Sequence, residues 1–333
     1  MRQTLRKVRV LVRPAKQSAL RWVRGRFDRR TWCRDLSEIA PAHRRPVSSV
    51  LQFFSANHNI GNYTPVLGIH DMLGQRLDTW NVHKRPIDFD FINDRYRGLI
   101  IGGAGLLDPC FEPFWHELFE HCRLPMIIWG VGGCWPHDRP VSRSMRDVAS
   151  EVGRLCELIN VRDTRTADFF GLTSADVSPC PTIAWLRRFR EDACPRTVLL
   201  AEHQTLVPGV DRRSIERMVR QVAADYLHTL NYQQPDFGLV DLIRYRYLPA
   251  SRVVTTRLHG AIIANGLGIP YIALACDEKL SVYAREWGGG RLVHAAEEIP
   301  AALCAPLDAV DAAGLEAKTR CFGQRARAWV ESL

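Results

Sequence analysis

The sequence predicts an α/β protein of two Rossmann-like domains with parallel sheets and a cleft between them. Its 333 residues are too many for one ordinary core and suit two domains of roughly 150 residues each. Short apolar and β-branched runs alternate with amphipathic stretches, the pattern of strands joined by crossover helices. That alternation pauses once, at residues 187–196, where charged residues follow one another without apolar periodicity. We therefore place a domain boundary there.

The first series of units forms an N-terminal domain over residues 48–190. Its predicted strands are 50–54, 99–101, 126–129 and 158–161. Each run ends in a turn-forming or polar residue, which is how a buried parallel strand reads in sequence. Amphipathic periodicity predicts helices over 114–122 and 143–156.

The second series forms a C-terminal domain over residues 191–333. Its predicted strands are 198–201, 252–255 and 271–274, and its predicted helices are 212–225, 261–267 and 313–330. Because parallel strands all end at one edge of a sheet, each domain should carry its functional residues directly after its strands.

Residues 1–47 read as a basic leader that precedes the first domain. Residues 1–45 contain fourteen lysines and arginines against three acidic residues, so the rest of the chain is nearly neutral although the net charge is +9. Leucine, valine, tryptophan and phenylalanine lie between the cations, and this pattern suits the surface of an anionic membrane. A solvated helix or poorly ordered leader explains the same pattern, and a transit peptide explains it less well. No apolar run is long enough to span a bilayer.

The composition argues against several other classes. Ten cysteines are scattered along a chain without a signal peptide, so they read as reduced thiols of a cytosolic protein. They form no CxxC pair or zinc-ligand spacing, and neither a metal nor a cofactor is predicted. No nucleic-acid-binding signature accompanies the basic leader, so nucleic acid is not an expected partner.

Three predicted strands of the first domain end in small or amide residues. Asparagines follow the first strand, and glycines follow the next two. Glycine turns let backbone N–H groups approach an anion at the start of a helix, although tight turns also need glycine for steric reasons. The candidate binding residues are Asn57, Asn59, Asn62, Gly102, Gly103, Gly105, Gly132 and Gly133.

Charged residues follow the other strands. Arg162 comes directly after the fourth strand, where its guanidinium can bind a carboxylate or phosphate or pair with Asp163. In the second domain Thr256-Arg257-Leu258-His259-Gly260 joins a strand to a helix, so that a fixed cation and a titratable imidazole can face one pocket. Lys279 follows the next strand and is a further candidate cation.

Taken in order, these motifs resemble the polysaccharide pyruvyltransferase family. The resemblance covers about residues 48–290, and its most specific parts are Val161-Arg162-Asp163 and Thr256-Arg257-Leu258-His259-Gly260. It implies a fold similar to the two-domain GT-B glycosyltransferases and transfer of a pyruvyl group from phosphoenolpyruvate to a sugar as a ketal. It also implies that Arg162, Arg257 and His259 bind phosphoenolpyruvate, with His259 as the acid/base group. No cofactor is implied, because phosphoenolpyruvate is a substrate.

The resemblance further implies a sugar acceptor of a cell-envelope or exported polysaccharide, often lipid-linked, which would give a basic leader a role at the inner face of the membrane. Two other functions stay open: a GT-B glycosyltransferase that uses a nucleotide sugar, and a non-catalytic sugar-binding or regulatory protein. The sequence does not decide whether the chain forms a homo-oligomer.

Overall fold

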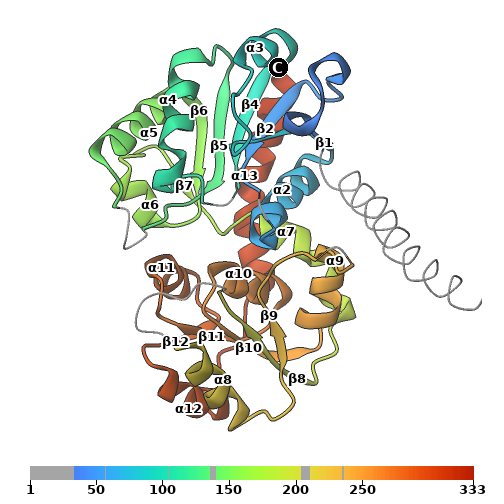
Figure 1. Ribbon diagram of the computed structural model, residues 1–333, viewed down its shortest axis with the longest axis vertical. Coiled ribbons are helices and arrows are strands. Elements are labelled where there is room, and N and C mark those ends of the chain that lie inside the picture. The colour runs from blue at the N-terminus through green and yellow to red at the C-terminus, as the bar shows by residue number, and fades with distance from the viewer. Residues whose placement is uncertain (1–33, 57, 104, 136–139, 204–210, 235) are drawn as a thin grey trace, which may run out of the picture.

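A computed structural model describes residues 34–56, 58–103, 105–135, 140–203, 211–234 and 236–333. These residues form two α/β lobes, one above the other, and each lobe is built on its own parallel sheet with helices around it (Figure 1).

The first lobe contains a seven-stranded parallel sheet in the order β1-β3-β2-β4-β5-β6-β7. Its central strands are buried along their whole length, because helices cover both faces. The strands are β1 Arg34–Asp35, β2 Val50–Phe54, β3 Asp78–Asn81, β4 Gly98–Gly102, β5 Met126–Val131, β6 Cys156–Val161 and β7 Asp176–Val177.

Helices and apolar side chains fill both faces of this sheet. Phe53, Trp115 and Ile128 belong to the larger core, while Trp129 and Ile69 belong to a second cluster on the opposite face. The helices of this lobe are α2 Ile60–Leu73, α3 Phe89–Arg95, α4 Glu112–His121, α5 Arg143–Leu155 and α6 Thr164–Phe169.

The second lobe contains a five-stranded parallel sheet in the order β12-β11-β10-β8-β9. Its strands are β8 Thr197–Ala201, β9 Leu227–Thr229, β10 Ala250–Thr255, β11 Tyr271–Leu274 and β12 Gly290–Val293. The helices from the end of the first lobe onward are α7 Thr182–Leu186, α8 Arg212–Arg220, α9 Leu239–Leu242, α10 Leu258–Leu267, α11 Glu278–Trp287 and α12 Ile299–Cys304. Helix α10 is buried along its whole length, so the residues at its start are held firmly.

The last helix, α13 (Ala312–Ser332), joins the two lobes. Leu315 packs in the core of the second lobe, whereas Phe322 and Trp329 pack in the second cluster of the first lobe. Figure 1 shows α13 running from the lower lobe up behind the upper sheet. The chain therefore returns to its first lobe after completing the second.

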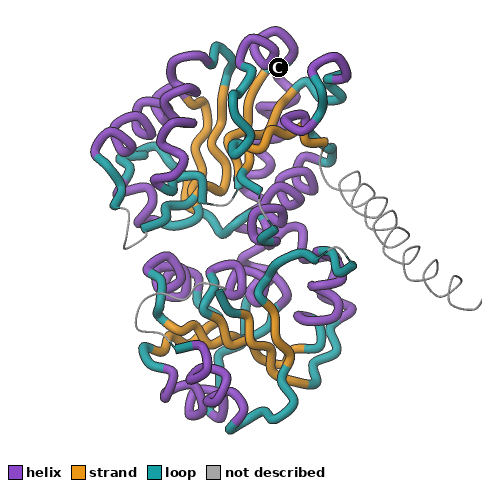
Figure 2. The backbone as a smooth tube through the Cα atoms, in the orientation of Figure 1, coloured by secondary structure: helices purple, strands orange, loops and turns teal. Residues whose placement is uncertain are grey.

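The predicted strands all lie within observed strands, and α13 includes the predicted final helix. The helix predicted over 212–225 ends at Arg220 instead. Among the observed strands of three or more residues, β3, β9 and β12 were not predicted. Figure 2 shows the strands of each lobe gathered into a sheet that helices surround, and β3, β9 and β12 belong to these sheets.

The predicted leader is too long at its C-terminal end. Strand β1 pairs with β3, and Leu36 is fully buried in the first core. The guanidinium of Arg44 lies 4.7 Å from the centre of the Trp80 ring and pairs with Asp88 at 3.0 Å. Residues from Arg34 onward therefore belong to the first lobe, while residues 1–33 lie outside the described residues.

Among the described residues, no helix combines the length and apolar character needed to cross a membrane. The nine cysteines in this part of the chain are free thiols.

Candidate active site

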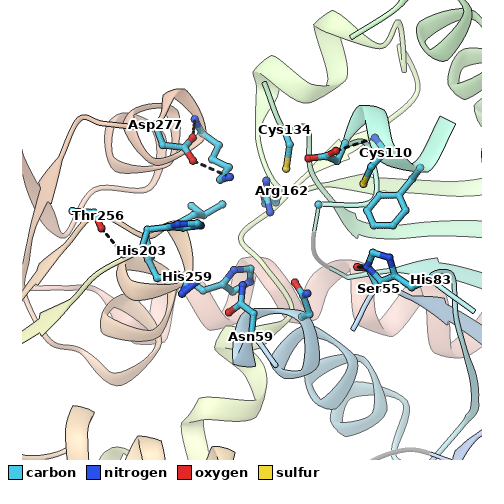
Figure 3. Close-up of a pocket in the computed structure, with 17 residues that line it drawn as sticks. Ser55, Asn59, His83, Cys110, Cys134, Arg162, His203, Thr256, His259 and Asp277 are labelled. Atoms are coloured by element: carbon cyan, nitrogen blue, oxygen red, sulfur yellow. Dashed lines mark hydrogen bonds and ion pairs between the residues drawn. The ribbon is translucent and has the colours of Figure 1, made fainter. Parts of the chain in front are cut away.

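A cavity of about 250 Å³ lies where the carboxyl ends of the two sheets face each other. Figure 3 shows His203 and His259 on one side of it, Ser55, His83 and Cys110 on the other, and Arg162 between them. Both lobes line the cavity: Ser55, Asn59, Asn62, His83, Gly105, Asp108, Cys110, Phe111, Cys134, Arg162, His203, Thr256, Arg257, Leu258, His259, Asp277 and Lys279.

Arg162 follows β6 and is almost completely buried. Its guanidinium lies flat against Gly132, where a Cβ would come within 2.1 Å of its Nε. One Nη donates to the Gly133 carbonyl at 3.0 Å, and Nε lies 3.5 Å from the Asp163 carboxylate. Asp163 in turn accepts from the Thr166 N–H and hydroxyl at 2.7 Å each. These contacts fix the guanidinium at the cavity wall.

Arg257 reaches the cavity from the other lobe. Its N–H donates to the Thr255 hydroxyl at 2.9 Å, which fixes the backbone before α10. Its guanidinium donates to the Leu230 carbonyl and lies 4.8 Å from the centre of the Tyr232 ring. Burial lowers the pKa of Arg257, yet an arginine keeps its charge at neutral pH.

His259 is the second residue of α10, and its imidazole is buried at the junction of the lobes. Its Nε2 has no hydrogen-bond partner among the described residues. Burial lowers its pKa well below the usual value, and the charges of Arg162, Arg257 and Lys279 lower it further. The lowered pKa keeps the imidazole neutral at neutral pH, whereas the sequence pattern predicted a group that titrates there.

The start of α11 adds Lys279, whose ammonium lies 2.8 Å from the Asp277 carboxylate. Burial opposes the charge of Lys279, but the nearby Asp277 carboxylate stabilises that charge, and the pKa of Lys279 is raised above the usual value. The Cys134 thiol is itself kept protonated, because burial raises its pKa. Lys279 is thus a third cation of the cavity.

The cavity wall formed by the residues after β2, β3 and β4 differs in charge from the rest of the cavity. His83 Nε2 lies 3.0 Å from the Ser55 hydroxyl, and the His83 ring packs against Phe111 at 5.0 Å between centres. Burial lowers the pKa of His83, while Asp108 opposes this effect. Among the described residues that line this wall there is no lysine or arginine.

The structure brings most of the predicted site residues together. The cavity is lined by Asn59, Asn62, Gly105, Arg162, Arg257, Leu258, His259 and Lys279. Asn57 lies outside the described residues. Asn59 and Asn62 lie at the start of α2, where the Asn59 side chain accepts from the Gly61 N–H at 3.0 Å.

Four predicted glycines do not line the cavity. The Gly103 N–H donates to the Trp129 carbonyl at 3.0 Å, and the Gly133 N–H donates to the Thr166 hydroxyl at 2.9 Å. Gly102 packs against Ile69, and Gly132 packs against Arg162. Steric packing thus explains Gly102 and Gly132, and internal hydrogen bonds occupy the N–H groups of Gly103 and Gly133, so the structure gives these glycines roles other than the predicted contact with a ligand.

Several lining residues were not predicted: His83, Asp108, Cys110, Phe111, Cys134, His203 and Thr256. Asp108, Cys110 and Phe111 lie only a few residues beyond the predicted glycine run, so a wider search after that strand would have found them. His83 follows β3, a strand that the sequence pattern did not show.

The site combines fixed cations with a neutral buried imidazole and a helix start. The first N–H groups of α10, near Leu258, have no acceptor within the helix and favour an anion. No group of three or more His, Cys, Asp or Glu able to hold a metal ion occurs in the part of the chain that the structure describes. The arrangement suits a small, multiply charged anion and proton transfer at one atom of it.

A family model described as polysaccharide pyruvyl transferase matches residues 59–278, which include Arg162, Arg257 and His259, while Lys279 directly follows the matched range. A comparison with curated protein sequences found no match.

Solved structures with a similar fold include three epimerases. The UDP-GlcNAc 2-epimerase of Methanocaldococcus jannaschii is 9% identical, with a TM-score of 0.51 over 83% of this chain and 99% of its own. The Neisseria meningitidis enzyme, bound to UDP-GlcNAc, is 11% identical, with the same TM-score and the same shares. A putative UDP-N-acetylglucosamine 2-epimerase of Listeria monocytogenes is 11% identical, with a TM-score of 0.50 over 84% and 91%. At these identities the likeness shows the fold alone, and it confirms the predicted two-lobed, GT-B-like class.

Proposed function

The chain belongs to the polysaccharide pyruvyl transferase family, and we propose that it transfers the pyruvyl group of phosphoenolpyruvate to two hydroxyls of a sugar, forming a ketal in the biosynthesis of a cell-envelope or exported polysaccharide. Family membership supports pyruvyl transfer to a polysaccharide. The donor and the ketal chemistry are what the resemblance of the motifs implies, and the charges of the site fit them.

One observation carries the proposal: Arg162, Arg257 and Lys279 are gathered around the buried imidazole of His259. Phosphoenolpyruvate carries a carboxylate and a phosphate on a three-carbon frame. Arginine forks match both groups, and a lysine adds a compact charge. Buried cations interact with an anion far more strongly than exposed cations do, because little water screens them.

Donor binding also changes the state of His259. In the free site the three cations disfavour the imidazolium. A bound anion with several negative charges reverses this field and raises the pKa of the imidazole. His259 is therefore able to take up a proton with the donor and to deliver it to the enol methylene.

The reaction then balances as follows. A sugar hydroxyl bonds to C2 and loses its proton, which reaches the leaving phosphate by way of solvent, while the methylene carbon gains a proton from His259 and becomes a methyl group. The C2–O bond to phosphate breaks, and phosphate leaves toward the arginines. A second hydroxyl bonds to C2, and its proton restores His259. Arg162 and Arg257 stabilise the charge that develops on the leaving phosphate.

The proposal is tested by ligand-dependent thermal stability, since a ligand that binds only the native state raises Tm by mass action. We expect phosphoenolpyruvate to raise Tm of the wild type and not of Arg257→Ala. The matched control is Arg291→Ala, because Arg291 also donates to a carbonyl, that of Pro306, but does not line the cavity. A shift with nucleotide sugars alone would contradict the proposal and favour a glycosyltransferase.

The role of His259 is tested by His259→Gln, which keeps a polar side chain without an acid or base. Release of phosphate from phosphoenolpyruvate in the presence of acceptor sugars should fall by about 10²- to 10⁴-fold. Activity near that of the wild type would remove His259 from the mechanism.

A further inference from the structure

The cavity is longer than the proposed donor requires. Arg162 follows β6, whereas Ser55 follows β2 and His83 follows β3. In the sheet order these strands span β6-β5-β4-β2-β3. The Arg162 guanidinium lies against Gly132 and donates to the Gly133 carbonyl, directly after β5, while His83 reaches the Ser55 hydroxyl, directly after β2. About two strand spacings of about 4.8 Å, or about 10 Å along the sheet edge, therefore separate the two groups. A three-carbon donor bound near Arg162, Arg257 and Lys279 leaves the end of the cavity near His83 for another ligand.

The wall at that end has the chemistry of a site for a neutral polyol. It offers the Ser55 hydroxyl, the His83 imidazole and the Asp108 carboxylate, and the largely buried ring of Phe111 lies beside them. A carboxylate repels a second phosphate but accepts hydrogen bonds from sugar hydroxyls. The wall is therefore complementary to an uncharged sugar.

His83 is held in place for contact with such a ligand. The Ser55 hydroxyl lies 3.0 Å from Nε2, and the ring packs against Phe111. Among the charged groups around it, Asp108 favours the imidazolium and Lys84 disfavours it, while burial keeps the resting imidazole neutral. A neutral imidazole at the end of the cavity can accept a proton, and Asp108 stabilises the charge that results.

We propose that Ser55, His83, Asp108 and Phe111 form the acceptor-sugar subsite, and that His83 accepts the proton of the hydroxyl that attacks the pyruvyl carbon. This inference rests on the proposed function. The hydroxyl oxygen bonds to C2, its proton moves to His83, and His83 releases it to water after the ketal has closed. The leaving phosphate takes a proton from water, so that charge and protons balance.

The experiment compares His83→Gln with His116→Gln. His116 is a matched control, because its Nε2 also lies 3.0 Å from a serine hydroxyl, that of Ser144, outside the cavity. The acceptors are p-nitrophenyl glycosides of glucose, galactose, mannose and their N-acetylamino forms. We expect His83→Gln to bind phosphoenolpyruvate like the wild type, while kcat for ketal formation falls by about 10²- to 10⁴-fold.

The pH profile separates a base from a merely structural residue. If His83 is the base, kcat/KM for the acceptor should fall at low pH in the wild type and in His116→Gln, and this fall should disappear in His83→Gln. Unchanged kcat, or loss of affinity for phosphoenolpyruvate in His83→Gln, would overturn the assignment.

Protection from diethyl pyrocarbonate tests the subsite without turnover. Peptide mass spectrometry should show that at least one glycoside slows modification of His83 and that none slows modification of His116. If no glycoside of the panel protects His83, the subsite is wrong. Failure of the wild type to bind phosphoenolpyruvate would instead contradict the proposed function, so the two failures are distinct.

Discussion

The imidazole of His259 packs directly against the backbone of Gly61. A Cβ at residue 61 would lie 2.4 Å from both Cγ and Nδ1 of the ring. Gly61 is the second residue of α2, and the neighbouring Ile60 N–H donates to the Asn231 carbonyl of the second lobe at 2.9 Å. The start of α2 therefore positions a histidine that belongs to the other lobe.

Gly61→Ala should displace the His259 ring, because no real Cβ contact is that short. A shift of about 1 Å in a catalytic group costs on the order of 10²-fold in rate. We expect kcat to fall by that amount in an assay of phosphate release. The control is Gly323→Ala in α13, where the nearest atom is the flexible Met72 sulfur. Equal losses in both variants would point to a general effect on the fold.

The neutral state of His259 predicts how stability depends on pH. The folded protein resists protonation of this imidazole, whereas the unfolded chain takes up a proton with a pKa near 6.5. The unfolded state thus binds more protons below about pH 6.5, and the free energy of unfolding falls as the pH drops through that value. Urea unfolding between pH 5 and 8 should show a weaker pH dependence for His259→Gln.

The comparison of the wild type with His259→Gln separates the contribution of His259 to the pH dependence of stability from that of other titrating groups. Asp35, whose pKa burial raises to about 6, changes stability in the opposite sense, but it does so equally in both proteins. An identical slope for wild type and His259→Gln would contradict a neutral imidazole.

Helix α11 holds the segment that follows Arg162. The Glu286 carboxylate accepts from the Thr164 N–H at 3.1 Å and from its hydroxyl at 2.7 Å, and the Trp287 indole donates to the Arg162 carbonyl at 2.9 Å. Glu286→Gln should weaken these contacts between the lobes by about 1 kcal/mol. Titration calorimetry should then show about fivefold weaker binding of phosphoenolpyruvate. Glu120→Gln, at an exposed position of α4, is the control, and equal affinities in both variants would show that Glu286 does not position Arg162.

Sequence patterns predicted the strands and helices whose buried positions carry apolar residues at the expected spacing. The strand before Arg257 is β-branched and apolar, and it ends in a motif that the structure places in the cavity. Strand β3 reads Asp-Thr-Trp-Asn, so three of its four residues are polar, yet all four are buried. Asp78 is tolerated there because the Val47 N–H donates to it at 2.7 Å and the Tyr96 hydroxyl at 3.2 Å. Such tertiary partners do not appear in a local pattern, and His83 was missed together with this strand.

The described residues also determine which deletion can test the role of the basic leader. A deletion of residues 1–45 would remove β1 and the buried Leu36, so it would damage the fold as well as the charge. A deletion of residues 2–32 ends before Arg34 and removes eleven lysines and arginines.

Each basic residue near an anionic bilayer contributes about 1 kcal/mol to binding. Cosedimentation should therefore show loss of binding to vesicles that contain phosphatidylglycerol, with Tm unchanged. The wild type should release these vesicles as salt increases, because the attraction is screened. Unchanged binding after the deletion would show that residues 2–32 do not bring the enzyme to a membrane, and a lipid-linked acceptor would then need another explanation for its access to the cavity.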